Sequence, residues 1–349
     1  MERRRSRPLR LACPIPSRIS PHADAVQEWL LDWVGGLDLP LDDKGRSRLA
    51  QGGFARYAAR LYPGATQADL RTLTALFTWF FLVDDACDGS SVGGPDQVRA
   101  LRDGALRLLR GATGGPETGT PVGTVAGALH RILVEVWRTP RLRMPARWRA
   151  RFVEAVAHHL DGVLVESSNK AIGRQPTVTE YVTLRRATSA AYVSYTLIEF
   201  ATGLPVPEAA YHHPAVREVA ATGNDLLSWF NDLISLERDT ASSGGHNLVL
   251  AVAREQGLSV ADAVQATAGR WQETMYRFVE LRAAVPSFGP TIDDAVWHHL
   301  DGVASSVRGT IDWSLESGRY RDDAGPAISV PPVPLPAPVA GPSPAQTAG

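Results

Sequence analysis

The sequence has very few cysteines and lysines. Only Cys13 and Cys87 are cysteines among its 349 residues, and neither is paired with histidines at zinc-site spacing. A disulfide framework and a structural zinc site are therefore excluded. Lys44 and Lys170 are the only lysines, so almost every basic side chain is arginine. A formal net charge of -1 leaves no broad basic field for nucleic acid.

A hydrophobic run long enough for a membrane span is also lacking. The longest apolar stretch without charge, residues 72–83, falls well short of the ~20 residues that a spanning helix needs. The start, MERRRSRPLRLACPIPS, is basic, but its apolar part is too short and too interrupted by proline for a secretory signal. We therefore predict a reduced, cytoplasmic protein with no membrane span.

Apolar residues recur at three and four positions through most of the chain, as on one face of an α-helix. We expect helices over residues 22–35, 45–61, 67–87, 121–138, 145–167, 188–202, 214–239, 259–284 and 291–317. Glycine- and proline-rich breaks separate these segments. The prediction is an all-α protein with a loose basic arm at 1–14, a single domain at 15–322 and a disordered proline-rich tail at 323–349.

The stretch FLVDDACDGS, residues 81–90, places three aspartates within five positions. On a helix, Asp84 and Asp88 lie on one face, one turn apart. Two carboxylates at the negative end of a helix dipole are disfavoured unless a cation is bound. A hard ion such as Mg²⁺, which prefers oxygen ligands, would resolve the conflict. The simpler alternative is an exposed acidic helix end.

A second set of oxygen donors occurs in NDLISLERD, residues 231–239. Asn231, Ser235 and Asp239 are spaced four apart, so they follow one stripe of a helix. The apolar neighbours SWF (228–230) favour a stripe that points inward. Such a pattern alone is commonly surface, but together with the aspartates it predicts a two-sided metal site.

These motifs resemble the two metal motifs of class I terpene synthases in the bacterial cyclase branch. The resemblance continues in CPIPSRISPHADAVQEW near the start, YVTLRRATSA (181–190), HNLV (246–249) and WSLESGRY (313–320), and it covers about residues 13–321. The chain departs from the family pattern at Asp239, where glutamate is usual, and at Ser189 or a neighbour, where glycine is common. The resemblance implies a helical bundle with a central active-site cavity.

The family implies a Mg²⁺-dependent cyclase that ionises a linear prenyl diphosphate, with farnesyl diphosphate as first choice, and releases pyrophosphate. Three Mg²⁺ ions are expected by this resemblance. Two would be held by Asp84, with Asp88 in some members, and the third by Asn231, Ser235 and Asp239. The expected donors to pyrophosphate are Arg185, Arg238, Arg319 and Tyr320. Of these, the expected catalytic residues are Arg185, Arg319 and Tyr320. Asp85 is expected to pair with one of those arginines on closure.

Aromatic rings stabilise a carbocation without reacting with it. Phe80, four positions before Asp84, and Trp313 are the candidates for the cavity wall, with ordinary core packing as the alternative. Three His-His pairs, 158–159, 212–213 and 298–299, cannot easily share an ion, because neighbours on a helix point about 100° apart. We expect them at the surface or partly packed.

Several alternatives stay open. The substrate could be geranylgeranyl diphosphate, which would make a diterpene cyclase, or geranyl diphosphate. A prenyl chain-elongating transferase uses the same metals, although it typically has two aspartate-rich motifs. A non-catalytic helical binding protein is a more remote alternative. The oligomeric state is open, with a homodimer as one choice.

Overall fold

A computed structural model describes residues 9–37, 39, 47, 49–88, 94–111, 124–242, 246–320 and 327–331, without the side chains of 85–88, 242 and 319. Regular structure in these ranges is almost entirely helical, which confirms the all-α prediction. The helices are α1 (Ala23–Gly35), α3 (Phe54–Leu61), α4 (Gln67–Asp88), α5 (Pro95–Leu109), α6 (Val125–Arg143), α7 (Ala146–Ala171), α8 (Val178–Thr188), α9 (Ala191–Thr202), α10 (Glu208–Tyr211), α11 (Pro214–Ile234), α12 (Leu236–Ser242), α13 (Leu248–Gln256), α14 (Val260–Ala283), α15 (Pro290–Glu316) and the 3₁₀ turn η2 (Gly318–Tyr320). No helix in the described part of the chain is long and apolar enough to cross a membrane.

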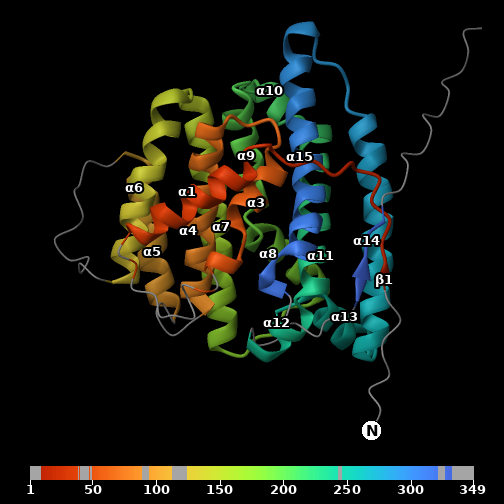
Figure 1. Cartoon of the computed structure of the whole chain (residues 1–349). Helices are drawn as coiled ribbons and strands as arrows, with labels where there is room; N and C mark the ends of the chain where they lie inside the picture. The colour runs from red at the N-terminus through yellow and green to blue at the C-terminus, as the bar shows by residue number, and fades with distance from the viewer. Residues whose placement is uncertain are drawn as a thin grey trace, which may run out of the picture.

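The helices pack around a continuous apolar core. Figure 1 places α4 and α6 on one side of the bundle and α14 on the other, with α7, α9, α11 and α15 between them. Fully buried tryptophans join neighbouring helices, because each indole N–H also needs a hydrogen-bond acceptor. Trp79 donates to the carbonyl of Leu129 at 2.9 Å, and Trp271 donates to that of Leu226 at 2.8 Å. Apolar burial and these bonds together fix the relative positions of the helices.

Two helix breaks shape the interior. Between α8 and α9, Ala190 has φ +56°, in the left-handed region that is costly for a residue with a Cβ. Between α11 and α12 the chain breaks at Ser235, so the expectation of one helix over 214–239 is wrong. The helical spacing nevertheless continues, because Ser235 N–H donates to the Asn231 carbonyl at 2.8 Å and Asp239 N–H to the Ser235 carbonyl at 2.9 Å.

Both ends of the described chain differ from the expected arm and tail. β1 (Leu9–Arg10) pairs in parallel with β2 (Ile328–Ser329). Leu9, Leu11 and Cys13 are buried at alternate positions, which is the pattern of a half-buried extended strand. The Gln272 side chain on α14 also binds the N–H and the carbonyl of Ala12, at 2.7 and 3.2 Å. Residues 9–14 and 327–331 are therefore ordered by burial and backbone pairing, while the rest of both segments lies outside the described residues.

Candidate active site

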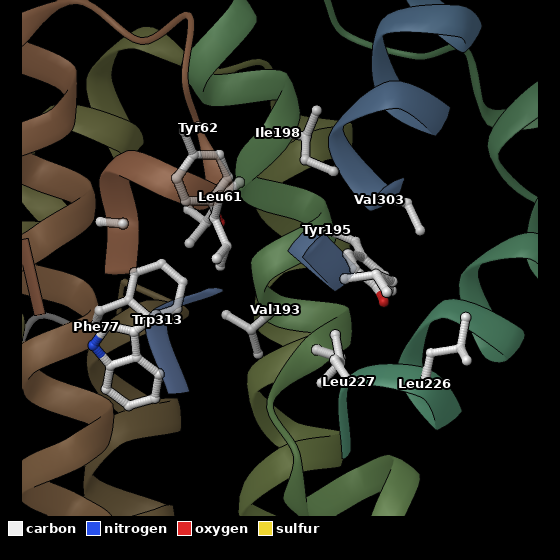
Figure 2. Packing of buried hydrophobic residues seen from close by; sticks show 14 of the residues in the cluster. Leu61, Tyr62, Phe77, Val193, Tyr195, Ile198, Leu226, Leu227, Val303 and Trp313 are labelled. Atoms are coloured by element: carbon white, nitrogen blue, oxygen red, sulfur yellow. The ribbon is translucent and has the colours of Figure 1, made fainter. Parts of the chain in front are cut away.

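A cavity of about 640 Å³ opens between α4, α7, α8, α9, α11 and α15. Part of its wall is apolar and aromatic. Figure 2 shows Phe77 and Trp313 on one side, with Val193 and Leu227 across from them, and all four line the cavity. Polar residues also line this cavity. They include Asp84, Arg185, Asn231, Asp232, Arg238, Asp239 and Tyr320.

Arg185 extends from α8 towards the end of α11. Its Nε donates to Oδ1 of Asp232 at 2.9 Å, and its Nη2 donates to Oδ1 of Asn231 at 2.9 Å. Burial disfavours the charge, but the Asp232 carboxylate raises the pKa of Arg185 above its ordinary value. The guanidinium therefore stays positive at every working pH and presents a fixed charge at the cavity.

Asn231 connects Arg185 to the C-terminal segment. Its Nδ2 donates to the hydroxyl oxygen of Tyr320 at 2.7 Å. The Tyr320 ring meets Trp313 edge-on, with ring centres 5.7 Å apart, and the guanidinium of Arg238 lies 5.3 Å from the Tyr320 ring centre. One contiguous cluster thus contains Arg185, Asn231, Arg238 and Tyr320, all of them predicted from the sequence, and it adjoins the aromatic residue Trp313.

Ser235 and Asp239 form the second half of the predicted metal motif. The Ser235 hydroxyl oxygen lies 2.6 Å from Oδ2 of Asp239 and 2.7 Å from the Asn231 carbonyl. Arg238 donates to the other Asp239 oxygen at 3.3 Å. Ser235 does not itself line the cavity and is fully buried, whereas Asn231 and Asp239 reach the cavity wall.

This donor set fits a hard cation. Asn231, Ser235 and Asp239 bring an amide, a hydroxyl and a carboxylate oxygen together, with the Ser235 hydroxyl 2.6 Å from Oδ2 of Asp239. Oxygen donors of these kinds suit Mg²⁺. Among the described side chains, no three of His, Cys, Asp or Glu are close enough to hold an ion, so Asn231 and Ser235 would have to contribute.

The structure describes only part of the first acidic cluster, residues 84–88. Asp84 lies near the end of α4, is exposed, and lines the cavity that Asn231 and Asp239 also line. The side chains of Asp85, Asp88 and Arg319 lie outside the described residues, although α4 extends through Asp88. The structure therefore brings Asp84 and the second motif to one cavity.

Both predicted aromatic candidates line the cavity. Trp313 packs against Tyr57 and Phe81, with ring centres 4.4 and 5.6 Å apart, and its indole N–H donates to the Gly52 carbonyl at 2.8 Å. Phe80 meets the His159 ring edge-on at 5.4 Å. Because of burial, the pKa of His159 is lowered to about 4, so this wall residue is neutral near pH 7.

The sequence analysis did not single out Asp232, Tyr181 or Asn247 as site residues. Asp232 accepts from the Tyr181 hydroxyl at 2.8 Å, and Asn247 donates to the Asp232 carbonyl at 2.8 Å and to Oδ2 of Asp239 at 3.1 Å. Asn247 also caps α13 by accepting from the Val249 N–H. Its position before the apolar run LVLAV is a cap signal that could have predicted a helix there.

Comparison with known proteins agrees with the geometry. The family described as terpene synthase family 2, C-terminal metal binding, matches residues 75–277. The 10-epi-cubebol synthase of Sorangium cellulosum is 30% identical, over 89% of this chain and 98% of its own. The (+)-T-muurolol synthase of Roseiflexus castenholzii is 32% identical, over 89% of this chain and 93% of its own. The crystal structure of a linalool/nerolidol synthase from Streptomyces clavuligerus has a TM-score of 0.75 at 27% identity, covering 87% of this chain and 99% of that one.

The range matched by the family contains Asp84, Arg185, Asn231, Ser235 and Asp239, the residues on which the sequence resemblance depended. The two named relatives are matched along nearly their whole lengths. The chain therefore belongs to the terpene synthase family: it is an enzyme of the carbon–oxygen lyase class and carries that family's metal-binding domain.

Proposed function

We propose that the protein is a Mg²⁺-dependent cyclase that ionises farnesyl diphosphate and closes the carbocation into a sesquiterpene hydrocarbon or alcohol. The observation that carries this proposal is a single cavity lined both by arginines and oxygen donors and by aromatic rings. A prenyl diphosphate needs both kinds of lining, because its anionic head is joined to a long apolar tail.

The names of relatives support the choice of substrate. The Roseiflexus enzyme is named as cyclising (2E,6E)-farnesyl diphosphate. The Streptomyces clavuligerus linalool/nerolidol synthase has also been solved with 2-fluorogeranyl diphosphate. A cavity of about 640 Å³ is in the ordinary range for a small-molecule site. Geranyl and geranylgeranyl diphosphate are the alternatives that a product assay must include.

The residues that would hold Mg²⁺ are those with hard oxygen donors at the cavity. They are Asp84, Asn231, Ser235 and Asp239, with Asp88 as a further expected ligand and three ions as the expected number. Bound Mg²⁺ supplies positive charge that stabilises the pyrophosphate leaving group.

Ionisation breaks the bond between C1 of the prenyl chain and its diphosphate oxygen. The electron pair leaves with pyrophosphate, and the organic fragment becomes an allylic cation. Arg185, Arg238 and Tyr320 line the cavity, and their N–H and O–H groups would donate to the pyrophosphate oxygens as negative charge builds there. Arg319 is a fourth expected donor. Asp85 is expected to form an ion pair with one of these arginines.

The cation then needs a wall that is electron-rich but does not react with it. Phe77, Phe80 and Trp313 line the cavity, and their ring faces would stabilise positive charge as it moves along the chain. Loss of a proton to the released pyrophosphate gives a hydrocarbon, whereas capture of water followed by loss of a proton gives an alcohol.

A prenyl chain-elongating transferase is the main rival. Such an enzyme typically has a second aspartate-rich motif, and this chain has Asn231 and Ser235 in the second motif instead. Incubation with a short prenyl diphosphate and isopentenyl diphosphate separates the two functions, because only the transferase makes longer diphosphates.

The proposal includes three further points carried over from the sequence. The first is a single catalytic domain over residues 15–322, to which the paired chain ends attach. The second is a cytoplasmic location, and the third is a homodimer as the alternative to a monomer. Light scattering on the purified full chain tests the oligomeric state.

The experiment that tests the site compares two neighbouring arginines of α8. Arg185→Ala should abolish most product formation with helical circular dichroism unchanged, because it removes a donor to the leaving group. Arg186→Ala is the matched control, since Arg186 makes a two-pronged ion pair with Asp225, at 2.6 and 2.7 Å, and does not line the cavity. That variant should keep most turnover. Equal turnover in the two variants would contradict the assignment of Arg185.

A further inference from the structure

Asp232 is an enclosed carboxylate directly after Asn231, with 1% of its surface exposed. Its Oδ1 accepts from Nε of Arg185 at 2.9 Å. Its Oδ2 accepts from the Tyr181 hydroxyl at 2.8 Å and from the Leu248 N–H at 3.2 Å. Both of its oxygens accept from protein donors, and the side chain is almost fully enclosed. Asp232 is therefore committed to protein partners.

The guanidinium of Arg185 is held along one edge only. Arginine has five N–H donors in a rigid plane, and within the described structure Arg185 uses two of them, towards Asp232 and Asn231. Because the plane is rigid, fixing Nε and one Nη2 hydrogen also fixes the direction of the other three donors. Arg185 lines the cavity, where those donors can meet an anion.

We propose that Asp232 is a positioning residue that holds the Arg185 guanidinium in the orientation needed to bind the pyrophosphate group. This inference rests on the proposed function, because it assigns Asp232 a role through Arg185. Tyr181 and the first turn of α13 hold Asp232 in turn, so the orientation of Arg185 also depends on the donors that bind the other oxygen of Asp232.

The same network reaches the predicted metal ligand Asp239. Asn247 donates to the Asp232 carbonyl and to Oδ2 of Asp239, while its own oxygen caps α13. All three bonds agree with one orientation of the amide, and Asn247 is fully buried. Through Asp232 and Asn247, the N-terminus of α13 fixes both an arginine donor and an acidic ligand, and α8, α12 and α13 lie towards the same end of the bundle (Figure 1).

The chain contains a matched control for Asp232. Asp225 also lies in α11, is 5% exposed, and pairs with an arginine of α8, namely Arg186. This second pair lines a separate surface groove and does not line the cavity. Replacing either aspartate by asparagine removes one buried carboxylate from an α8–α11 ion pair, but only Asp232→Asn releases Arg185.

The test measures binding of inorganic pyrophosphate with Mg²⁺ by calorimetry, together with turnover of farnesyl diphosphate. Asp232→Asn should weaken pyrophosphate binding and lower kcat/KM by on the order of 10- to 100-fold, as is usual when a supporting partner of a binding group is lost. Asp225→Asn should leave pyrophosphate affinity and kcat/KM within about threefold of wild type. This holds even if Asp225→Asn lowers the melting temperature as much as Asp232→Asn does. In the Arg185→Ala background, Asp232→Asn should cause almost no further loss, because both changes act through one group.

Three results would overturn the proposal. They are unchanged pyrophosphate affinity in Asp232→Asn, equal losses in Asp232→Asn and Asp225→Asn, and additive losses with Arg185→Ala. If Asp232→Asn does not fold, Tyr181→Phe replaces it, and a loss of about threefold or more in pyrophosphate affinity supports the role while unchanged affinity refutes it. A wild-type protein that neither binds pyrophosphate nor forms a terpene would instead refute the proposed function itself.

Discussion

At the scale of single residues, the site depends on side chains that each take part in several hydrogen bonds. Asp239 illustrates this, since its carboxylate is shared by Ser235, Asn247 and Arg238. The family resemblance implies glutamate at this position, which is longer by one methylene. Magnesium tolerates little error in its near-octahedral shell, so a shorter ligand has a measurable consequence.

We predict that Asp239→Ala loses activity, while Asp239→Glu keeps it and lowers the Mg²⁺ concentration needed for half-maximal rate. The reason is that the carboxylate of aspartate reaches roughly 1.5 Å less far, so a water fills the gap and the ion is bound more weakly. Titration of the initial rate with Mg²⁺ measures the effect. Unaltered Mg²⁺ dependence in Asp239→Ala would show that Asp239 is not a ligand.

Sequence motifs and the family resemblance predicted several residues that line the cavity, but not all of them. Asn231 and Asp239 were identified from motif and spacing, and Arg185 and Tyr320 from the family resemblance. Asp232 was missed, because its role depends on a hydrogen bond with Tyr181, 51 residues earlier in the chain. No local sequence pattern reveals that contact. The buried member of a pair such as His158–His159 was missed for a similar reason, since packing decides which of the two faces inward.

At the scale of elements, helix ends and breaks position the site. Long helices were predicted well from extended apolar periodicity, but that signal alone missed α5, α8, α10 and α13. Caps carried the signal for two of them, α8 and α13, and Asn247 is the N-cap of α13. Thr177 and Glu180 form a capping box at the start of α8, a local pattern that marks a helix N-terminus. The break at Ser235 could not be predicted, since the hydrogen bonds on either side keep helical spacing.

The left-handed backbone conformation before α9 leads to a prediction about backbone strain. Ala190 has φ +56°, so Ala190→Gly should raise the free energy of unfolding by about 0.5–1 kcal/mol and the melting temperature by about 1–3 °C. Ala201→Gly, inside α9, is the control and should lower the free energy of unfolding by about 1 kcal/mol. Thermal unfolding of the two variants checks the signs. Destabilisation by both changes would argue that Ala190 is not strained.

At the scale of the whole molecule, the two ends of the described chain are joined. The alternating pattern Leu9, Leu11 and Cys13 was present in the sequence but too short to identify a strand without its partner, which lies more than 300 residues later. The expected arm was therefore partly wrong for a physical reason: pairing with a distant segment ordered it.

We predict that Leu11→Ala lowers the free energy of unfolding by about 2–3 kcal/mol, because Leu11 is 3% exposed and its removal leaves a cavity. Arg10→Ala, at the exposed neighbouring position, should change it by less than about 0.5 kcal/mol. Urea unfolding of both variants provides the comparison. A negligible effect of Leu11→Ala would mean that this segment does not pack on the folded protein.

Buried histidines predict a dependence of stability on pH. Burial lowers the pKa of His299 to about 4, below its unfolded value of about 6.5. Between these values the unfolded chain binds more protons, so this contribution is complete above about pH 6.5 and is lost as the pH falls towards 4. Glu199 works in the opposite direction, because burial raises its pKa to about 7 and its contribution shrinks as the pH rises from 4.5 to 7.

A single substitution isolates the histidine contribution. Relative to wild type, His299→Gln should gain about 2 kcal/mol of unfolding free energy on going from pH 7.5 to pH 5, since it removes the proton uptake of the unfolded state. Urea unfolding at the two pH values measures this difference. Parallel curves for the two proteins would refute a depressed pKa for His299.

The central claim is that this cavity ionises a prenyl diphosphate and cyclises the cation, and the most direct measurement is product analysis by gas chromatography–mass spectrometry. The full chain is offered geranyl, farnesyl and geranylgeranyl diphosphate separately, with Mg²⁺ and after chelation of divalent ions. The account predicts cyclic fifteen-carbon products from farnesyl diphosphate, with release of pyrophosphate, only when Mg²⁺ is present. Absence of any terpene from all three substrates, or products unaffected by chelation, would contradict it.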